Sequence, residues 1–173
     1  FVPQPKQLGL GHAVLCAERA VGNEPFAVLL ADDFLINDGE GVTADLLRAH
    51  EMTGKSQLSV MQVDGPSISK YGVVKPDNFT GAVAGLIEKP DFKVAPSNLA
   101  SIGRYVLSSD IFNILRNQQP GKGGEIQLAD SINRQATKGN VQAVTLNGNR
   151  FDCGSVRGYL NAIVHVAERD GFL

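Results

Sequence analysis

The stretch that decides the fold is residues 26–33, FAVLLADD. Its first six residues are apolar without alternation, which is typical of a strand covered on both faces. The run stops at Asp32 and Asp33, and the carboxyl ends of strands are where open α/β sheets bind ligands. Asp32 is therefore a candidate Mg²⁺ ligand. The alternative for this acidic pair, and for Asp33 above all, is a helix cap or a turn former.

Patterns of helix and strand alternate on both sides of this stretch. A glycine loop opens into a helix over residues 9–20, and residues 44–52 predict a helix with Thr43 as N-cap and Gly54 after its end. The remaining expected strands are 58–63, 71–74, 82–90, 101–107 and 141–146, and the remaining helices are 109–116, 125–137 and 156–169, the last capped by Ser155. The alternation predicts one α/β domain over residues 1–173, with a mixed, mainly parallel sheet between helices.

Composition excludes several classes of protein. A hydrophobic share of 43% in 173 residues is enough for one sizeable core, and a net charge of −2 leaves no basic surface for nucleic acid. The apolar runs are too short to cross a membrane, and the first residues do not read as a secretory signal. A glycosylation sequon at residues 78–80 matters only in a secreted protein. Cys16 and Cys153 lack the spacing of a disulfide framework or zinc site, so we expect both to be reduced.

Other polar residues lie where strands or loops end. Glu88 and Lys89 follow an apolar run, and lysine suits a phosphate while glutamate accepts hydrogen bonds from sugar hydroxyls. A surface ion pair is an equally good explanation of these two residues. The Gly9-Leu10-Gly11 loop offers backbone amides to an anion or a base edge, although its motif is incomplete. Asp152, before a capped helix, is either a second metal carboxylate or part of a turn.

The order of the motifs along nearly the whole chain resembles that of the bacterial UTP:glucose-1-phosphate uridylyltransferase family. The segments that carry the resemblance are Gln4 with residues 8–14 (LGLGHAV), 28–32 (VLLAD), 71–74 (YGVV), 88–90 (EKP), 95–100 (APSNLA), 103–107 (GRYVL), 124–128 (GEIQL) and 152–154 (DCG). The resemblance implies a Rossmann-like nucleotidyltransferase fold. It also implies transfer of uridylyl from UTP to glucose 1-phosphate, giving UDP-glucose and pyrophosphate without a covalent enzyme intermediate.

The resemblance also implies roles for particular residues. Lys89 and Asp32 would carry the catalysis, Lys89 by neutralising phosphate charge on the sugar side and Asp32 by holding Mg²⁺. Asp152 matches a second metal carboxylate of related sugar nucleotidyltransferases. Nucleotide binding is implied for Gln4 and the backbone at Gly9, which would read uracil, and sugar binding for Gly72, Glu88, Lys89 and Glu125.

Two motifs with which the family begins, a Gly-x-Gly-Thr-Arg loop and a Pro-Lys-Glu-Met segment, are not found in this sequence. We therefore expect the chain to match the C-terminal, larger part of the family and to be inactive alone. A non-catalytic nucleotide-sugar-binding domain is the alternative from another class, and thymidylyl transfer or mannose 1-phosphate is an alternative within the enzyme class. The resemblance further implies a cytoplasmic protein that is a homo-oligomer when intact.

Overall fold

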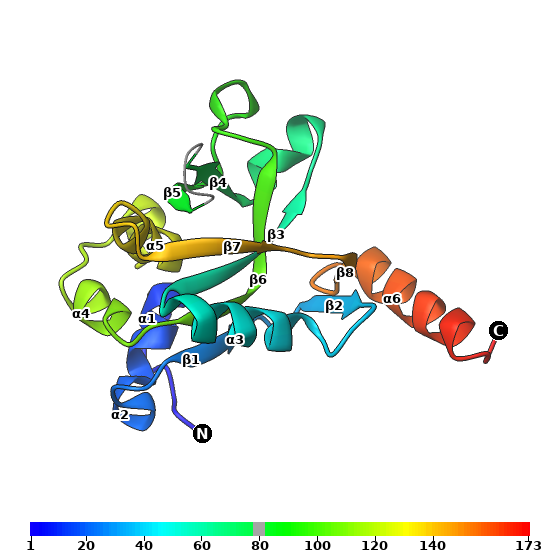
Figure 1. Ribbon diagram of the computed structural model, residues 1–173, viewed down its shortest axis with the longest axis horizontal. Coiled ribbons are helices and arrows are strands. Elements are labelled where there is room, and N and C mark those ends of the chain that lie inside the picture. Colours follow the sequence, from blue (N-terminus) through cyan, green and yellow to red (C-terminus); the bar gives the residue numbers. More distant parts are fainter. Residues whose placement is uncertain (78–81) are drawn as a thin grey trace.

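A six-stranded sheet forms the centre of the molecule (Figure 1). The computed structural model describes residues 1–77 and 82–173, so the sequon at residues 78–80 lies outside the described residues. The strands of the sheet are β1 (Phe26–Leu29), β3 (Ser56–Gln62), β4 (Gly72–Pro76), β5 (Val83–Glu88), β6 (Leu99–Leu107) and β7 (Val141–Thr145). Their order is β5-β4-β6-β3-β7, and β1 pairs with β6 outside this order.

Most strand pairs in this sheet are antiparallel. β3 and β7 run parallel, whereas β1–β6, β3–β6, β4–β5 and β4–β6 are antiparallel. The mixed sheet is confirmed, but the expected predominance of parallel strands is wrong for the described strands. The reason is that no α-helix lies among the described residues that connect β4, β5 and β6, and antiparallel neighbours need only short connections.

Helices cover both faces of the sheet. Leu58 and Val60 face the main apolar core, which they share with α1 (Leu10–Cys16), α4 (Ile111–Arg116) and α5 (Leu128–Ala136). The alternate residue Gln57 points to the other face, where its Nε2 donates to Thr53 Oγ1 of α3 (Val42–Thr53) over 2.9 Å. The short helices in the connections are α2 (Glu18–Val21), η1 (Gly65–Lys70), η2 (Phe92–Val94) and η3 (Lys122–Gly124).

β1 is shorter and more exposed than the sequence predicts. Phe26 and Val28 pack against the main core, but Ala27 and Leu29 are exposed. Ala27 and Leu29 lie on the same face of β1, so that face is uncovered and the expectation of two covered faces is wrong. Among the described strands, β1 has β6 as its one partner, so it also lies at an edge of the sheet. The helix predicted over residues 9–20 is interrupted at Ala17, which divides it into α1 and α2.

The structure contains a second, two-stranded sheet that the sequence analysis does not predict. β2 (Asp33–Asn37) pairs antiparallel with β8 (Gly148–Asp152), and the register sets Asp33 opposite Asp152. We refer to this pair of strands as the β2–β8 ribbon. Its strands are short and carry polar residues, which hides them from a search for apolar runs.

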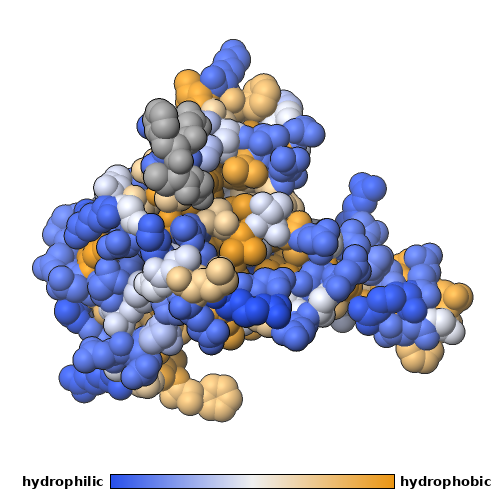
Figure 2. All heavy atoms as spheres, in the orientation of Figure 1, coloured by the Kyte–Doolittle hydropathy of each residue, from blue (hydrophilic) through white to orange (hydrophobic). Residues whose placement is uncertain are grey.

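α6 (Val156–Arg169) follows the β2–β8 ribbon and extends away from the sheet (Figure 1). Hydrophobic side chains gather at its free end (Figure 2), and exposed apolar residues also lie along the helix, namely Val156, Tyr159, Leu160, Ile163 and Val164. None of the helices in the described part of the chain is long and apolar enough to cross a membrane.

The N-caps of α6 and α3 give a matched stability test. Ser155 caps α6 as predicted, accepting a hydrogen bond from Gly158 N at 3.1 Å, whereas α3 begins at Val42 and Thr43 is not its cap. We expect Ser155→Ala to lower the free energy of unfolding by about 1 kcal/mol. Thr43→Ala is expected to change it by less than about 0.5 kcal/mol. Urea denaturation measures both, and equal losses would contradict the assignment of the caps.

Candidate functional site

The candidate site lies beside β6, at the point along this strand where its neighbour on one edge changes from β4 to β1. Ser101 of β6 is paired with Gly72 of β4, while Arg104 is paired with Leu29 of β1. β4 and β1 therefore lie along the same edge of β6, one after the other, and leave an opening between them. Beyond the end of β1 the chain still follows this edge, because Leu30 N donates to Gly103 O at 2.9 Å.

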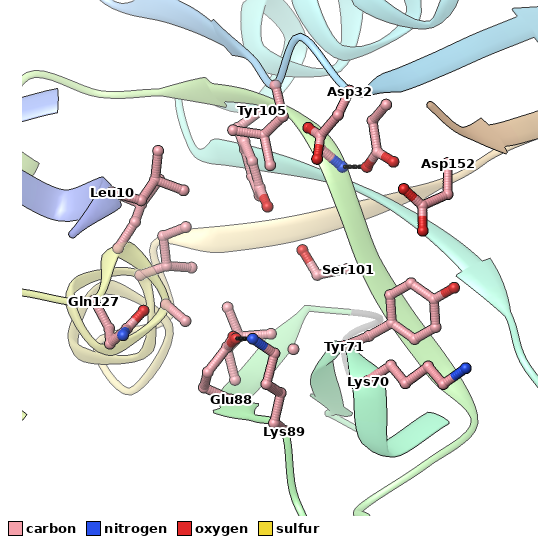
Figure 3. A pocket seen from close by; sticks show the side chains of 18 of the residues that line it. Leu10, Asp32, Lys70, Tyr71, Glu88, Lys89, Ser101, Tyr105, Gln127 and Asp152 are labelled. Atoms are coloured by element: carbon pink, nitrogen blue, oxygen red, sulfur yellow. Dashed lines mark hydrogen bonds and ion pairs between the residues drawn. The ribbon is translucent and has the colours of Figure 1, made fainter. Parts of the chain in front are cut away.

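A cavity of about 330 Å³ occupies this opening. Figure 3 shows Asp32 and Asp152 on one side of it and Glu88 and Lys89 on the opposite side, with Ser101 between them. A second hollow of about 480 Å³, formed partly by β5 and α5, shares Glu88 and Lys89 with it. Five residues predicted from the sequence thus line one cavity, namely Asp32, Gly72, Glu88, Lys89 and Asp152.

Asp32 and Asp152 lie together at one end of the cavity. Cys153 N donates to the carbonyl oxygen of Asp32 over 2.7 Å, which ties the two segments to each other. Asp152 is part of a turn, as the alternative for it predicted, because its Oδ1 accepts a hydrogen bond from Gly154 N over 3.2 Å. A Cβ added to Gly154 would lie 3.1 Å from Asp32 Oδ2 and 3.1 Å from Asp152 Oδ1, so both carboxylates border one small space. Mg²⁺ is commonly bound by one or two carboxylates together with phosphate oxygens, and this donor set fits it. The described residues contain no cluster of three or more His, Cys, Asp or Glu side chains that could hold a metal ion.

Asp33 is a buried structural carboxylate rather than a helix cap. Its backbone N–H donates to Leu30 O at 3.2 Å, so the alternative of a turn former describes its backbone correctly. Its side chain is only 7% exposed, and Oδ2 accepts a hydrogen bond from Gly103 N over 2.6 Å. The other oxygen, Oδ1, forms an ion pair with Arg150. The carboxylate thus occupies the edge of β6 between its two partner strands.

Arg150, which the sequence did not suggest as a site residue, is nearly buried beside the cavity. Its side chain is 12% exposed, its Nη1 donates to Tyr71 Oη over 3.1 Å, and its guanidinium lies 5.1 Å from the centre of the Tyr71 ring. Burial by itself would lower the Arg150 pKa, but the hydrogen bond to Asp33 and the charge of Asp33 outweigh it. The pKa is therefore raised above its ordinary value, and the side chain stays positively charged.

Glu88 and Lys89 form the opposite wall. Lys89 has φ 45°, the one positive φ at a non-glycine residue in the described chain, and its backbone N–H donates to Tyr71 O over 3.0 Å. Lys89 Nζ lies 3.5 Å from Glu88 Oε1, and the two side chains are 62% and 31% exposed. The surface ion pair offered as the alternative is therefore present, and it contributes little stability in water. It does not explain the strained backbone at Lys89, a feature that gathers at functional sites.

Gly72 has no side chain, and the Glu88 carboxylate occupies the space beside it. A Cβ at residue 72 would lie 3.1 Å from Glu88 Oε2.

Tyr105 lies deeper in the cavity, where burial raises its pKa to about 12. The Tyr105 hydroxyl therefore remains protonated at neutral pH and can donate a hydrogen bond to a ligand.

Three predicted site residues do not line the cavity. Gln4 Nε2 donates to Gly9 O over 3.1 Å, so these two lie together beside α1. Gly9 has φ 93°, and a Cβ there would come within 2.9 Å of the Glu125 Cβ, which explains the glycine structurally. Glu125 Oε2 accepts a hydrogen bond from Gln127 Nε2 at 2.7 Å, and Gln127 lines the cavity in its place.

Sequence reasoning missed Tyr71, Ser101, Tyr105, Gln127 and Arg150 among the lining residues. Local signals existed for two of them. Tyr71 directly precedes Gly72, and Arg150 lies two residues before Asp152, a spacing that puts both on one face of a strand.

The mixed sheet and the position of its cavity agree with the fold of a nucleotidyltransferase. The chain belongs to the nucleotidyl transferase family, whose model matches residues 1–169. It is 42% identical over 166 residues to the UTP–glucose-1-phosphate uridylyltransferase of Pseudomonas aeruginosa, covering 94% of this chain and 60% of that protein. A Staphylococcus epidermidis protein of the same name is 42% identical over 173 residues, with 98% and 60% covered.

Solved structures agree with this assignment. A UDP-glucose pyrophosphorylase complexed with UDP-glucose matches with a TM-score of 0.89 and 40% identity, covering 95% of this chain and 64% of the other. A UTP-bound enzyme from Acinetobacter baumannii matches with a TM-score of 0.81 and 38% identity, covering 95% and 58%. The predicted nucleotidyltransferase fold is thereby confirmed. The chain spans about 60% of the length of these curated relatives, and which part of them it corresponds to stays a prediction.

Proposed function

We propose that the whole protein transfers a uridylyl group from UTP to α-D-glucose 1-phosphate, giving UDP-glucose and pyrophosphate. The observation that carries the proposal is that Asp32 and Asp152 lie across one cavity from Glu88 and Lys89. The 42% identity to named uridylyltransferases supports the choice of base and sugar. That this chain is inactive alone, and that the intact protein is a cytoplasmic homo-oligomer, stay predictions.

The chemistry requires positioning and neutralisation of charge. A phosphate oxygen of glucose 1-phosphate attacks the α-phosphorus of UTP, the bond from that phosphorus to the bridging oxygen breaks, and pyrophosphate leaves. Lys89 offsets phosphate charge on the sugar side, while Glu88 accepts hydrogen bonds from glucose hydroxyls. Mg²⁺ held by Asp32 and Asp152 would supply further positive charge to the phosphates.

The nucleotide and the sugar have further contacts in this proposal. Gln4 and the backbone at Gly9 read the uracil edge beside α1. Gly72 lies against the sugar with Glu88, and the Tyr105 hydroxyl offers a donor from the floor of the cavity. Glu125 contacts a glucose hydroxyl after exchanging its hydrogen bond with Gln127 for one with the ligand.

Calorimetric titration of this chain with UDP-glucose, dTDP-glucose and GDP-mannose tests the choice of base and sugar. We expect saturable binding of UDP-glucose at least about tenfold tighter than that of the other two, a difference of roughly 1.4 kcal/mol. Preference for another nucleotide sugar would overturn the assignment. Turnover by the whole protein then separates an enzyme from a binding domain, because a domain without catalysis would bind UDP-glucose but release no pyrophosphate from UTP.

Loss of one carboxylate is expected to weaken metal binding. Mn²⁺, an analogue of Mg²⁺ with a spectroscopic signal, can be titrated into the chain and followed by electron paramagnetic resonance. Asp152→Asn should lower the Mn²⁺ affinity about tenfold or more, because a charged oxygen ligand is replaced by a neutral one. Asp45→Asn is the matched control, since Asp45 lies on α3 and pairs with Arg48 away from the cavity. Equal affinities of the Asp152→Asn protein and the wild type would remove Asp152 from the proposed metal site.

A further inference from the structure

The Arg150 side chain connects three segments of the candidate site. It belongs to β8, pairs with Asp33 at the start of β2, and donates to Tyr71 Oη over 3.1 Å. Asp33 in turn accepts Gly103 N from β6 over 2.6 Å. A single guanidinium therefore links the β2–β8 ribbon to the central sheet and to the segment that leads into β4.

Stability alone explains this arrangement poorly. Burying two charges costs solvation that their attraction only partly returns, so well-packed apolar residues are often as stabilising as a buried ion pair. The cost is higher here because Arg150 Nε is buried without a hydrogen-bond partner in the described part of the chain. What the planar guanidinium does provide is fixed geometry, since its nitrogens contact Asp33 and Tyr71 at the same time.

The segments that Arg150 joins carry the two ends of the proposed site. Asp33 is adjacent to Asp32 and paired in register with Asp152, so its position sets that of the carboxylate pair. At the other end, the Tyr71 carbonyl accepts Lys89 N over 3.0 Å. Moving the Arg150 side chain would therefore change the spacing between the carboxylates and the lysine.

Arg150 also determines which of three neighbouring carboxylates is left for a metal. Asp33 has one oxygen on Arg150 and the other on Gly103 N, and its side chain is only 7% exposed, so it faces these partners rather than the cavity. Asp152 has one oxygen, Oδ1, on Gly154 N and keeps Oδ2 for a ligand. Asp32 and Asp152 remain, on either side of Gly154.

We propose that Arg150 is a positioning residue that holds the Asp32–Asp152 carboxylate pair at a fixed distance from the Tyr71–Lys89 side of the cavity. The proposal rests on the proposed function for its ligands. One part of the proposal does not depend on any ligand. Arg150 limits the motion of residues 148–154 relative to residues 70–72.

The test compares Arg150→Lys, Tyr71→Phe and a control, Arg48→Lys, which alters an exposed ion-paired arginine on α3. Lysine keeps the charge but cannot bridge Asp33 and Tyr71, and phenylalanine keeps the ring but removes the hydroxyl. Amide hydrogen exchange, Mn²⁺ binding by electron paramagnetic resonance and calorimetry with UDP-glucose are measured on each full chain.

For Arg150→Lys we expect faster exchange at residues 148–154 and 70–72 and about tenfold weaker binding of both Mn²⁺ and UDP-glucose, the usual scale for loss of an outer-shell partner. Tyr71→Phe should leave Mn²⁺ affinity within about twofold, because the Asp33 pair survives, and weaken UDP-glucose several-fold. Arg48→Lys should change none of these. A folded Arg150→Lys protein with wild-type exchange and affinities would overturn the proposal.

Two other outcomes are also decisive. If the wild-type chain binds neither probe, the proposed function fails for this chain, and unchanged exchange in Arg150→Lys would then overturn the positioning role separately. If Arg150→Lys does not fold, Tyr71→Phe decides, and unchanged exchange at residues 70–72 together with unchanged UDP-glucose affinity would overturn the proposal.

Discussion

Gly103→Ala is expected to lower the free energy of unfolding by about 3–5 kcal/mol, which combines overpacking with a weakened hydrogen bond to a buried charge. The added Cβ would lie 2.6 Å from Asp33 Oδ2 and 2.7 Å from the Leu30 Cβ. The Asp33 carboxylate cannot retreat, because its other oxygen is paired with Arg150. The substitution thus forces apart the turn after β1 and the middle of β6.

Urea denaturation followed by circular dichroism measures this effect. Gly39→Ala is the matched control, since the nearest atom to a Cβ there is the Asn37 Nδ2 at an ordinary 3.7 Å. We expect the control to change the unfolding free energy by less than about 1 kcal/mol. If Gly103→Ala behaved like Gly39→Ala, the close contact of Asp33 with β6 would not exist in solution.

Lys89→Ala is expected to weaken UDP-glucose binding by about 2 kcal/mol, or roughly 30-fold, the scale of a hydrogen bond to a charged group. The wild-type affinity should also fall as salt is raised, and the variant should lose part of that dependence because a phosphate-facing charge is gone. Calorimetry at two ionic strengths measures both effects. Lys93→Ala is the control, since Lys93 is an exposed cation outside the cavity.

A second substitution at this position separates binding from folding. Lys89 has a left-handed backbone with φ 45°, which glycine adopts without strain. Lys89→Gly should therefore lose the same affinity as Lys89→Ala while being more stable than it, by about 1 kcal/mol. Wild-type affinity in both variants would remove Lys89 from the proposed site.

The parts of the site that could be predicted from the sequence are those signalled by a few adjacent residues. Asp32 after an apolar run, Glu88 and Lys89 at the end of another, and Asp152 before a capped helix are local patterns, and all four line one cavity. Their common location was not predictable from these patterns, because it depends on β4 and β1 sharing one edge of β6 and on the pairing of β2 with β8.

The remaining features depend on contacts between distant parts of the chain. The β2–β8 ribbon joins two five-residue segments more than one hundred residues apart, and nothing in either segment alone indicates that the other is its partner. The role of Asp33 required knowing that Gly103 and Arg150 meet it. Gln4, Gly9 and Glu125 show the opposite case, because their motifs are local but the folded chain places them outside the cavity.

The change of neighbour along one edge of β6, from β4 to β1, has a consequence for how the ligand preference of the cavity can evolve. Backbone register, through the pairs Gly72–Ser101 and Leu29–Arg104, sets where the opening lies along β6, and in our proposal Arg150 then fixes the distance across it. A substitution at Ser101, which lines the cavity, can therefore change the polar groups offered to a ligand without changing this backbone register. A protein with this fold can therefore change its ligand preference by replacing single lining residues, while the strand pairing that forms the opening is inherited unchanged.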